Sequence, residues 1–283
     1  CDVVMHPVDT VRTRLILQKN SSLYSGMFDA FGKIAKTEGL KTFYRGAGVV
    51  WSFTIPAHSL YFFGYEITKK NVQPNRADSE KGPLTHFSAG LVAEFLGALI
   101  WTPMDVIKQR QQMQTAASAT SSGEAKPYRT VGSAVRTILK HDGPTGLYKG
   151  FGAGLAVYGP FVGIYFVVYE QWKKSVGRLI NMKDAELPMP VHLSGGAIAG
   201  AVAAYVTTPL DVLKTTLQAR VDKSGKSVHK SVFDVARQVL REESWRGLMK
   251  GSSARVFWIA PGTAITIAAY EQCRRFFENQ GFP

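Results

Sequence analysis

Long apolar stretches with at most one charged residue alternate with charged segments along this chain. A helix needs about 20 mostly apolar residues to cross the hydrocarbon core of a bilayer. Four stretches come close to that length or exceed it: Gly46–Tyr65, Leu84–Met104, Phe151–Tyr169 and Leu187–Leu210. A fifth, Val256–Tyr270, is shorter. The pattern predicts membrane-spanning helices, because so many runs of this length are unusual in the core of a soluble domain.

Three short motifs recur in the same order three times along the chain, which indicates three copies of one structural unit. The motif Pro-x-Asp-x-x-basic begins at Pro7, Pro103 and Pro209. A second motif runs from an acidic residue to a glycine: Glu38–Gly46, Asp142–Gly150 and, in a looser copy, Glu243–Gly251. The motif Tyr-Glu-x-x-basic begins at Tyr65, Tyr169 and Tyr270.

Each copy predicts an apolar helix that contains the proline, a polar loop, a short amphipathic helix, a glycine and a second apolar helix. Backbone polar groups in lipid must be satisfied internally, so the spans are expected to be helical. The predicted fold is an all-α membrane protein with six transmembrane helices. Its three tandem repeats, 1–73, 83–180 and 188–283, are expected to form one transmembrane domain, with the start of the first helix missing.

The short helices are expected to be amphipathic and to lie near Met27–Thr37, Thr130–His141 and Ser231–Glu242. In the first of them, Phe28, Phe31, Ile34 and Ala35 fall at helical spacing and predict one apolar face.

The formal net charge of +13 changes this picture little. Lys69, Lys173 and Arg274 lie at the ends of apolar runs, where lipid headgroups accept basic side chains. This distribution argues against nucleic-acid binding. The two cysteines, Cys1 and Cys273, have no metal-type spacing, and no nucleophile motif or phosphate-binding glycine loop is present, so neither a cofactor, a metal site nor an enzyme is expected.

These three tandem motifs resemble the mitochondrial carrier family, whose hallmark is Pro-x-Asp/Glu-x-x-Lys/Arg on alternate helices. The resemblance covers essentially the whole chain. It implies a monomeric, multi-pass transporter of the mitochondrial inner membrane that binds cardiolipin and moves a small-molecule substrate. Six tilted helices would surround a central cavity that opens alternately to each side.

The resemblance also implies two rings of ion pairs that act as gates. Proline bends a helix because it removes a backbone hydrogen bond, and the acid and base that follow it share one helix face. The expected matrix-gate pairs are Asp9–Lys108, Asp105–Lys214 and Asp211–Arg12, braced by Gln112 and Gln218 but not at Ile16. The expected cytoplasmic-gate pairs are Glu66–Lys173, Glu170–Arg274 and Glu271–Lys69, braced by Tyr65, Tyr169 and Tyr270.

Glycines before the second helix of each repeat are candidate lipid sites, because free amides at a helix N-terminus bind phosphate groups. By the family resemblance, Gly46, Gly150 and Gly251, with Gly26 on the first short helix, would bind cardiolipin. The alternative is that these glycines only begin the helices.

The substrate positions implied by the family carry no arginine. They are Phe53, Thr54, Ala57, Val157, Tyr158, Phe161, Trp258 and Ile259, with Arg255 one turn earlier. Glu94 lies within a predicted span and Asp2 near the start, and an ionisable residue inside a membrane is a candidate for function. Carboxylates and aromatic rings without an arginine favour a cationic or zwitterionic solute.

Two subfamilies are similar in part. The run Ala254–Ile259, with Asp2 and Glu94, resembles the S-adenosylmethionine carriers. The run Pro56–Phe63, which contains His58, resembles the mitoferrins, and an imidazole suits Fe(II). An organic cation is the favoured substrate and iron the alternative. A non-transporting membrane scaffold with the carrier fold is a third possibility.

Overall fold

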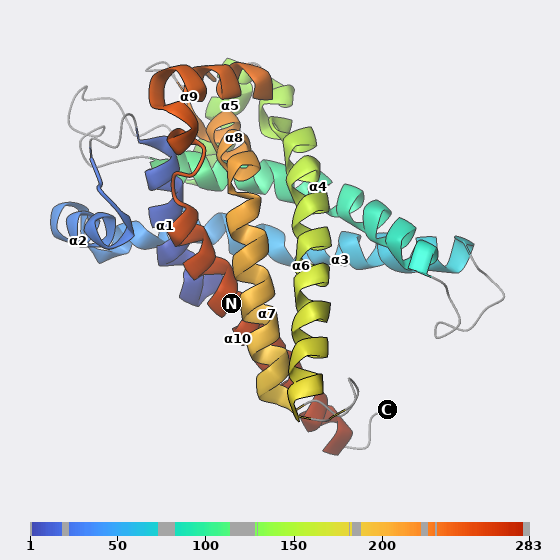
Figure 1. Cartoon of the computed structure of the whole chain (residues 1–283). Coiled ribbons are helices and arrows are strands. Elements are labelled where there is room, and N and C mark those ends of the chain that lie inside the picture. Colours follow the sequence, from blue (N-terminus) through green and yellow to red (C-terminus); the bar gives the residue numbers. More distant parts are fainter. Residues whose placement is uncertain are drawn as a thin grey trace. The chain divides into compact units, whose positions relative to one another are not determined.

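The computed structural model describes residues 2–18, 23–72, 83–113, 128, 130–180, 182, 188–221, 226–229 and 231–279, apart from the side chains of 2–3, 83–84, 86–87, 264 and 267–279. The helices are α1 (Asp2–Leu17), α2 (Met27–Glu38), α3 (Ala47–Val72), α4 (Pro83–Met113), α5 (Val131–Asp142), α6 (Phe151–Ile180), α7 (Met189–Val206), α8 (Thr208–Ala219), α9 (Val232–Gly247) and α10 (Ser252–Asn279), with the short 3-10 helices η1 (Leu40–Tyr44) and η4 (Pro144–Tyr148) (Figure 1). The all-α prediction is confirmed.

Two compact units divide the chain, and each combines segments from more than one repeat. The first unit contains Cys1–Tyr44, Val157–Val212 and Val239–Pro283, and the second contains Arg45–Ala156 and Leu213–Gln238. Each unit is described by itself below.

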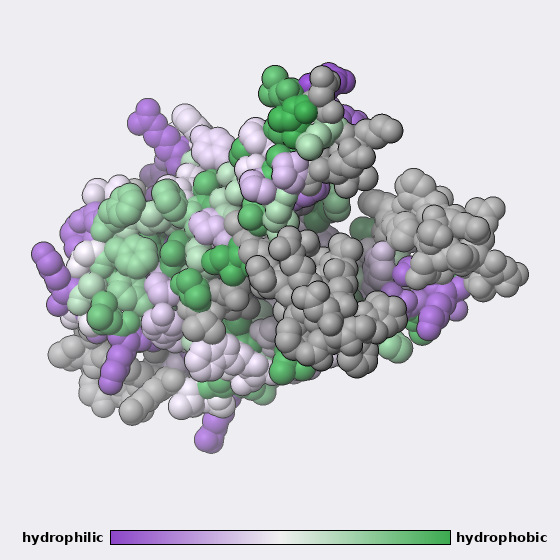
Figure 2. All heavy atoms as spheres, turned by 90° about the horizontal axis from the view of Figure 1, so that it is seen from below, coloured by the Kyte–Doolittle hydropathy of each residue, from purple (hydrophilic) through white to green (hydrophobic). Residues whose placement is uncertain are grey.

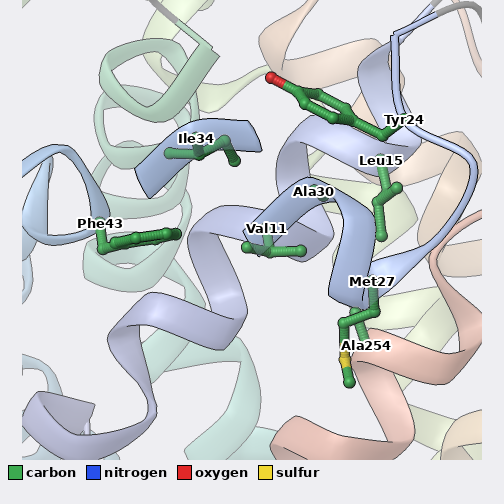
Figure 3. Packing of buried hydrophobic residues seen from close by; sticks show 8 residues of the cluster. All are labelled: Val11, Leu15, Tyr24, Met27, Ala30, Ile34, Phe43 and Ala254. Carbon is green, nitrogen blue, oxygen red and sulfur yellow. The ribbon is translucent and has the colours of Figure 1, made fainter. Parts of the chain in front are cut away.

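In the first unit, a hydrophobic core joins α1, α2, η1 and the start of α10. Figure 3 shows its side chains converging between these elements: Val11, Leu15, Tyr24, Met27, Ala30, Ile34, Phe43 and Ala254. The amphipathic helix α2 is confirmed, but its buried stripe is centred on Met27, Ala30 and Ile34. Phe28 is 77% exposed and meets Phe257 edge-on, so its assignment to the buried face is wrong. It lies one residue beyond Met27, which turns it away from the stripe.

In the same unit, α7 and α10 lie side by side (Figure 1). Small residues allow their backbones to approach: a Cβ added at Gly200 would lie 3.1 Å from Ile259 Cγ2. Ala199 and Ala203 of α7 are fully buried. Small residues at helix contacts are typical of membrane proteins, where close packing replaces the hydrophobic effect.

In the second unit, α3 packs along α4 (Figure 1), and a second core forms near the proline end of α4. This core contains Val49, Met104, Val106, Ile107, Tyr128, Ala134 and Ile138. It fixes α5 and the start of α3 against α4, the helix that contains Pro103 and Asp105.

The exterior of the molecule is rich in apolar side chains. Figure 2 shows green, hydrophobic groups at several places on the face in view, next to purple, hydrophilic ones. Exposed apolar residues include Trp51, Phe62, Phe63, Phe166 and Val167. Within the described residues, three segments are long and apolar enough to cross a membrane: Ser88–Met113, Pro144–Ile180 and Met189–Val206. Large exposed apolar surfaces are characteristic of contact with lipid.

Candidate functional site

In the second unit, the Pro-x-Asp-x-x-basic motif of α4 contacts the equivalent motif of α8. Lys214 Nζ on α8 lies 2.8 Å from Asp105 Oδ2, and Lys108 Nζ on α4 lies 3.7 Å from Asp105 Oδ1. Lys108 reaches the acid because positions i and i+3 share a helix face. The structure therefore brings together Asp105 and Lys214, which the family resemblance paired.

In the first unit, Arg12 on α1 binds Asp211 on α8 through Nη2 and Oδ2. Its Nη1 lies 3.4 Å from Oδ1 of Asp9, in its own motif. The guanidinium also lies over the ring of Trp258, 5.7 Å from the centroid. The predicted pair Arg12–Asp211 thus meets as well. Asp9 and Lys108 belong to different units, so their pairing stays a prediction.

The two glutamines after these motifs, Gln112 and Gln218, are fully buried. Gln218 Nε2 donates to the Lys149 carbonyl at 3.1 Å. This bond ties α8 to the residue before Gly150. The bracing of the ion pairs by Gln112 and Gln218 stays a prediction.

The described Tyr-Glu-x-x-basic motifs form the same local arrangement twice. Lys69 Nζ lies 3.4 Å from Glu66 Oε1 and 5.5 Å from the ring centroid of Tyr65. Lys173 Nζ lies 2.7 Å from Glu170 Oε1 and 5.1 Å from the ring centroid of Tyr169. Each tyrosine therefore faces the lysine of its own motif. The side chains of the third copy, Tyr270, Glu271 and Arg274, lie outside the described residues, and the pairs between helices stay predictions.

The glycines before α3, α6 and α10, the second apolar helix of each repeat, adopt a backbone conformation that favours glycine. Gly46, Gly150 and Gly251 have φ values of 86°, 76° and 73°, where side chains are disfavoured. An added Cβ would also meet the neighbouring proline helix: Lys108 O at 3.3 Å, Gln218 Cγ at 2.9 Å and Arg12 O at 3.4 Å, respectively. Gly26, before α2, is extended with φ −177°. This geometry favours the helix-start interpretation, and lipid binding at these glycines stays a prediction.

A cavity of about 170 Å³ lies in the second unit beside the Asp105–Lys214 pair. It is lined by Glu94, Ala98, Trp101, Thr102, Met104, Asp105, Phe151, Gly154 and Lys214. Glu94 is only 9% exposed, and its Oε2 has no hydrogen-bond partner among the residues that the structure describes. A buried carboxylate oxygen without a partner is costly, so this atom is available for a ligand.

Most of this lining was missed from the sequence. Glu94, Ala98, Trp101 and Asp105 follow one another at helical spacing, a signal that could have placed them on one face of α4. No sequence signal indicated Phe151 or Gly154, because they come from the start of a distant helix.

The predicted substrate positions of α3 lie outside this lining. Thr54 Oγ1 donates to the Val50 carbonyl at 2.6 Å, and Ala57 is fully buried. Phe53 packs against the core around Val49. His58 Nδ1 lies 2.9 Å from the Thr54 carbonyl, and its ring meets Trp101 edge-on at 5.6 Å. Of these four, only His58 contacts a residue of the cavity wall by a described ring contact.

The predicted positions of the first unit have varied surroundings. Val157 is buried, Tyr158 is half-buried, and Phe161 stacks on Tyr165. Ile259 packs against Gly200, and Trp258 faces Arg12. Their substrate role stays a prediction.

Arg255 is 4% exposed, and its guanidinium donates to the Thr207 carbonyl and Thr207 Oγ1, both at 2.9 Å. These bonds give Arg255 a structural partner within its own unit. Its substrate role stays a prediction.

The histidines and acids form no metal site in the described part of the chain. His192 Nδ1 lies 2.8 Å from Tyr169 Oη, and His58 bonds its own helix. Among the residues with described placement, no group of three or more His, Cys, Asp or Glu side chains could hold a metal ion. The side chain of Asp2 lies outside the description.

Comparison with known proteins gives the same pattern of repeats along the chain. The family model described as mitochondrial carrier protein matches residues 2–76, 79–179 and 185–281. The chain is 46% identical over 281 residues to mitochondrial substrate carrier family protein E of Dictyostelium discoideum, covering 98% of this chain and 92% of that protein. It is 33% identical to mouse solute carrier family 25 member 44, covering 96% and 86%, and 32% identical to human Mitoferrin-1, covering 98% and 80%.

Proposed function

Because the chain belongs to the mitochondrial carrier family, whose members are transporters, we propose that it carries a small cationic or zwitterionic solute across the mitochondrial inner membrane. The solute would bind Glu94, and the two rings of charged residues would act as the gates of an alternating-access cycle. Cardiolipin at the helix-start glycines and a monomeric state are part of this proposal.

The observation that carries the proposal is the carboxylate oxygen of Glu94, which lies in the cavity without a hydrogen-bond partner among the described residues. An ionisable side chain at membrane depth is costly and is retained where it acts on a substrate or ion. A bound ammonium or sulfonium group would supply the missing partner. Trp101 and Phe151 lie in the same wall, and aromatic rings attract a positive charge that lies over their faces.

The size of the cavity limits what enters it. About 170 Å³ is less than the roughly 300–1,000 Å³ of pockets that enclose a drug-sized ligand. The charged group of the solute would therefore occupy this cavity, and the remainder would extend beyond it. This fits an amino acid with a basic side chain as well as the sulfonium of S-adenosylmethionine.

The position of Glu94 suggests how binding would act on the gate. Asp105 and Lys214 line the same cavity, so a cation bound to Glu94 would lie near the Lys214 ammonium. Like-charge repulsion would weaken the Lys214–Asp105 pair. Buried ion pairs contribute little net stability, so a modest change can open such a gate. Binding that differs between two states shifts their populations.

A mitoferrin-like carrier of divalent metal is the second candidate. It is supported by the 32% identity to Mitoferrin-1 and by the contact of His58 with Trp101 in the cavity wall. Fe(II) accepts imidazole and carboxylate ligands, so Glu94 would serve in either case.

The test begins with thermal-shift screening of the purified carrier against S-adenosylmethionine, arginine, aspartate, ATP and Fe(II). Uptake of each solute that raises the apparent Tm is then measured in proteoliposomes. Glu94→Gln is expected to reduce uptake of the cation by at least about tenfold, because the charged partner is lost. Its apparent Tm should not fall, because an unpaired buried charge is removed.

The control is Asp29→Asn on α2, which removes an acid that pairs with Lys33 at 2.8 Å and is not part of the cavity lining. It should leave uptake unchanged, since exposed pairs contribute little. Unchanged uptake in Glu94→Gln would remove Glu94 from the mechanism. A Tm shift with Fe(II) alone would favour the metal carrier. If none of these solutes is transported, the non-transporting scaffold with the carrier fold is the interpretation that remains.

A further inference from the structure

Arg255 links two features of the third repeat that the gate needs. α7 ends at Val206 and α8 begins at Thr208, so a single residue, Thr207, interrupts the helix. Pro209 follows, and a proline has no N–H to give to the preceding turn. Arg255 donates from Nη1 to the Thr207 carbonyl and from Nη2 to Thr207 Oγ1, both at 2.9 Å. The guanidinium therefore supports the backbone at the break.

The same guanidinium reaches the gate acid one turn further along. Arg255 Nη1 lies 3.6 Å from Asp211 Oδ2, the oxygen that also binds Arg12 Nη2. One carboxylate thus stands between two guanidinium groups, each mostly buried. Arg12 additionally faces Trp258. Charge-assisted contacts of this kind are stronger than neutral ones and fix geometry, because the guanidinium donors form a rigid fork.

Only the third repeat has this side chain. The backbone N–H groups of Val50, Gly154 and Arg255 each donate to the carbonyl of the glycine that precedes their helix, at 3.3, 2.8 and 2.9 Å. The three residues therefore occupy equivalent positions. Valine is apolar, and glycine has no side chain, so neither can reproduce the forked contact of Arg255.

We propose that Arg255 is a positioning residue that holds Asp211 and the helix break at Thr207 in one geometry, so that Arg12 docks on a prearranged acid. In this ion pair Asp211 is held in place, and Arg12 is the partner that binds and leaves. The ion pair Arg12–Asp211 therefore differs from Asp105–Lys214, because an additional arginine positions its acid. The inference concerns the gate and does not depend on which solute is carried.

Trp258 provides a local probe that needs no substrate. In a full-length chain with Trp51, Trp101, Trp172 and Trp245 replaced by Phe, the emission of Trp258 is quenched with acrylamide. Arg255→Gln should raise the quenching constant about twofold, because a displaced Arg12 uncovers the indole face. Asp211→Asn should give a similar rise. The double variant should add little to either, because both changes break the same contact.

Conservative variants and a matched control complete the test. Arg255→Lys keeps the charge but loses the fork and should give an intermediate value. Thr207→Val removes one acceptor and should do the same, which keeps the test open if Arg255→Gln does not fold. Arg14→Gln is the control: Arg14 is also buried in this unit, but it pairs with Glu38 at 2.6 Å, so it should lower the apparent Tm and leave Trp258 unchanged.

The proposal fails if Arg255→Gln and Arg255→Lys both leave the quenching of Trp258 unchanged. It also fails if Asp211→Asn has no effect, or if the two single effects add fully in the double variant.

Discussion

At the residue scale, one serine occupies a backbone conformation that its repeat equivalents fill with glycine. Ser244 has φ 61° and ψ −172°, and Gly143 has φ 69° and ψ −172° at the same place of the second repeat. Gly39 is the equivalent of the first repeat, with φ 82°. This region is nearly restricted to glycine, because a Cβ meets the backbone there. In the third repeat, where the motif Glu243–Gly251 is a looser copy, the backbone at Ser244 is therefore strained.

Ser244→Gly is expected to stabilise the protein by about 1 kcal/mol, because it relieves that strain while adding some entropy to the unfolded chain. Gly143→Ser is the matched reverse change and should destabilise by a similar amount. Both are measured as the apparent Tm of the purified carrier in detergent. A drop in Tm for Ser244→Gly would show that the serine contributes more than its strain costs.

At the scale of elements, buried ion pairs fasten the short helices to the proline helices in two repeats. Arg14 on α1 binds Glu38 on α2 at 2.6 and 3.0 Å, and Arg110 on α4 binds Asp142 on α5 at 2.7 Å. The third repeat has Thr216 at the arginine position. There, Glu243 contacts Lys250, which also donates to the Gln18 carbonyl at 3.1 Å.

Asp142→Asn is expected to cost about 3–5 kcal/mol, because it leaves the fully buried Arg110 without its counter-charge. Glu243→Gln should cost clearly less, since Lys250 keeps its bond to Gln18. Differences in apparent Tm between the two variants and the parent protein check this order. Equal decreases in apparent Tm would mean that an ion pair of similar strength attaches the short helix in all three repeats.

The sequence predicted the helices, because three copies of each motif restrict the order of the elements. The partners Asp105–Lys214 and Arg12–Asp211 came from the resemblance to the carrier family, and both pairs are in contact. The remainder depends on packing between distant segments. Phe28 turned out exposed, since the period does not say where a stripe is centred. Arg255 and Gly154 occupy a position that carries a different residue type in each repeat, so the repeat pattern could not predict their contacts.

At the scale of the whole molecule, the proline motifs of different repeats contact one another in both units. Lys214 contacts Asp105 of the second repeat, and Arg12 contacts Asp211 of the third. In an alternating-access cycle, such contacts between repeats would close a gate. We therefore expect these two pairs to hold the proline-motif side of the carrier closed.

Asp105→Asn should shift the carrier towards the opposite state, because it removes the carboxylate that holds Lys214. The accessibility of a thiol at position 154 measures this shift, in a Gly154→Cys variant with Cys1 and Cys273 replaced by Ser. Its Cβ would lie 3.6 Å from Lys214 Cε, an ordinary contact, so the substitution should be tolerated. A membrane-impermeant maleimide, added to either side of proteoliposomes, should label the parent faster from the Tyr-Glu side.

In Asp105→Asn, labelling from the proline-motif side should rise about tenfold, the change that about 1.4 kcal/mol in the balance of the two states produces. Labelling from the Tyr-Glu side should fall, because the two openings exclude each other in an alternating cycle. The exposed Asp29→Asn variant should change neither rate. Equal increases from both sides would indicate a leak through a loosened protein, and would contradict a gate at Asp105.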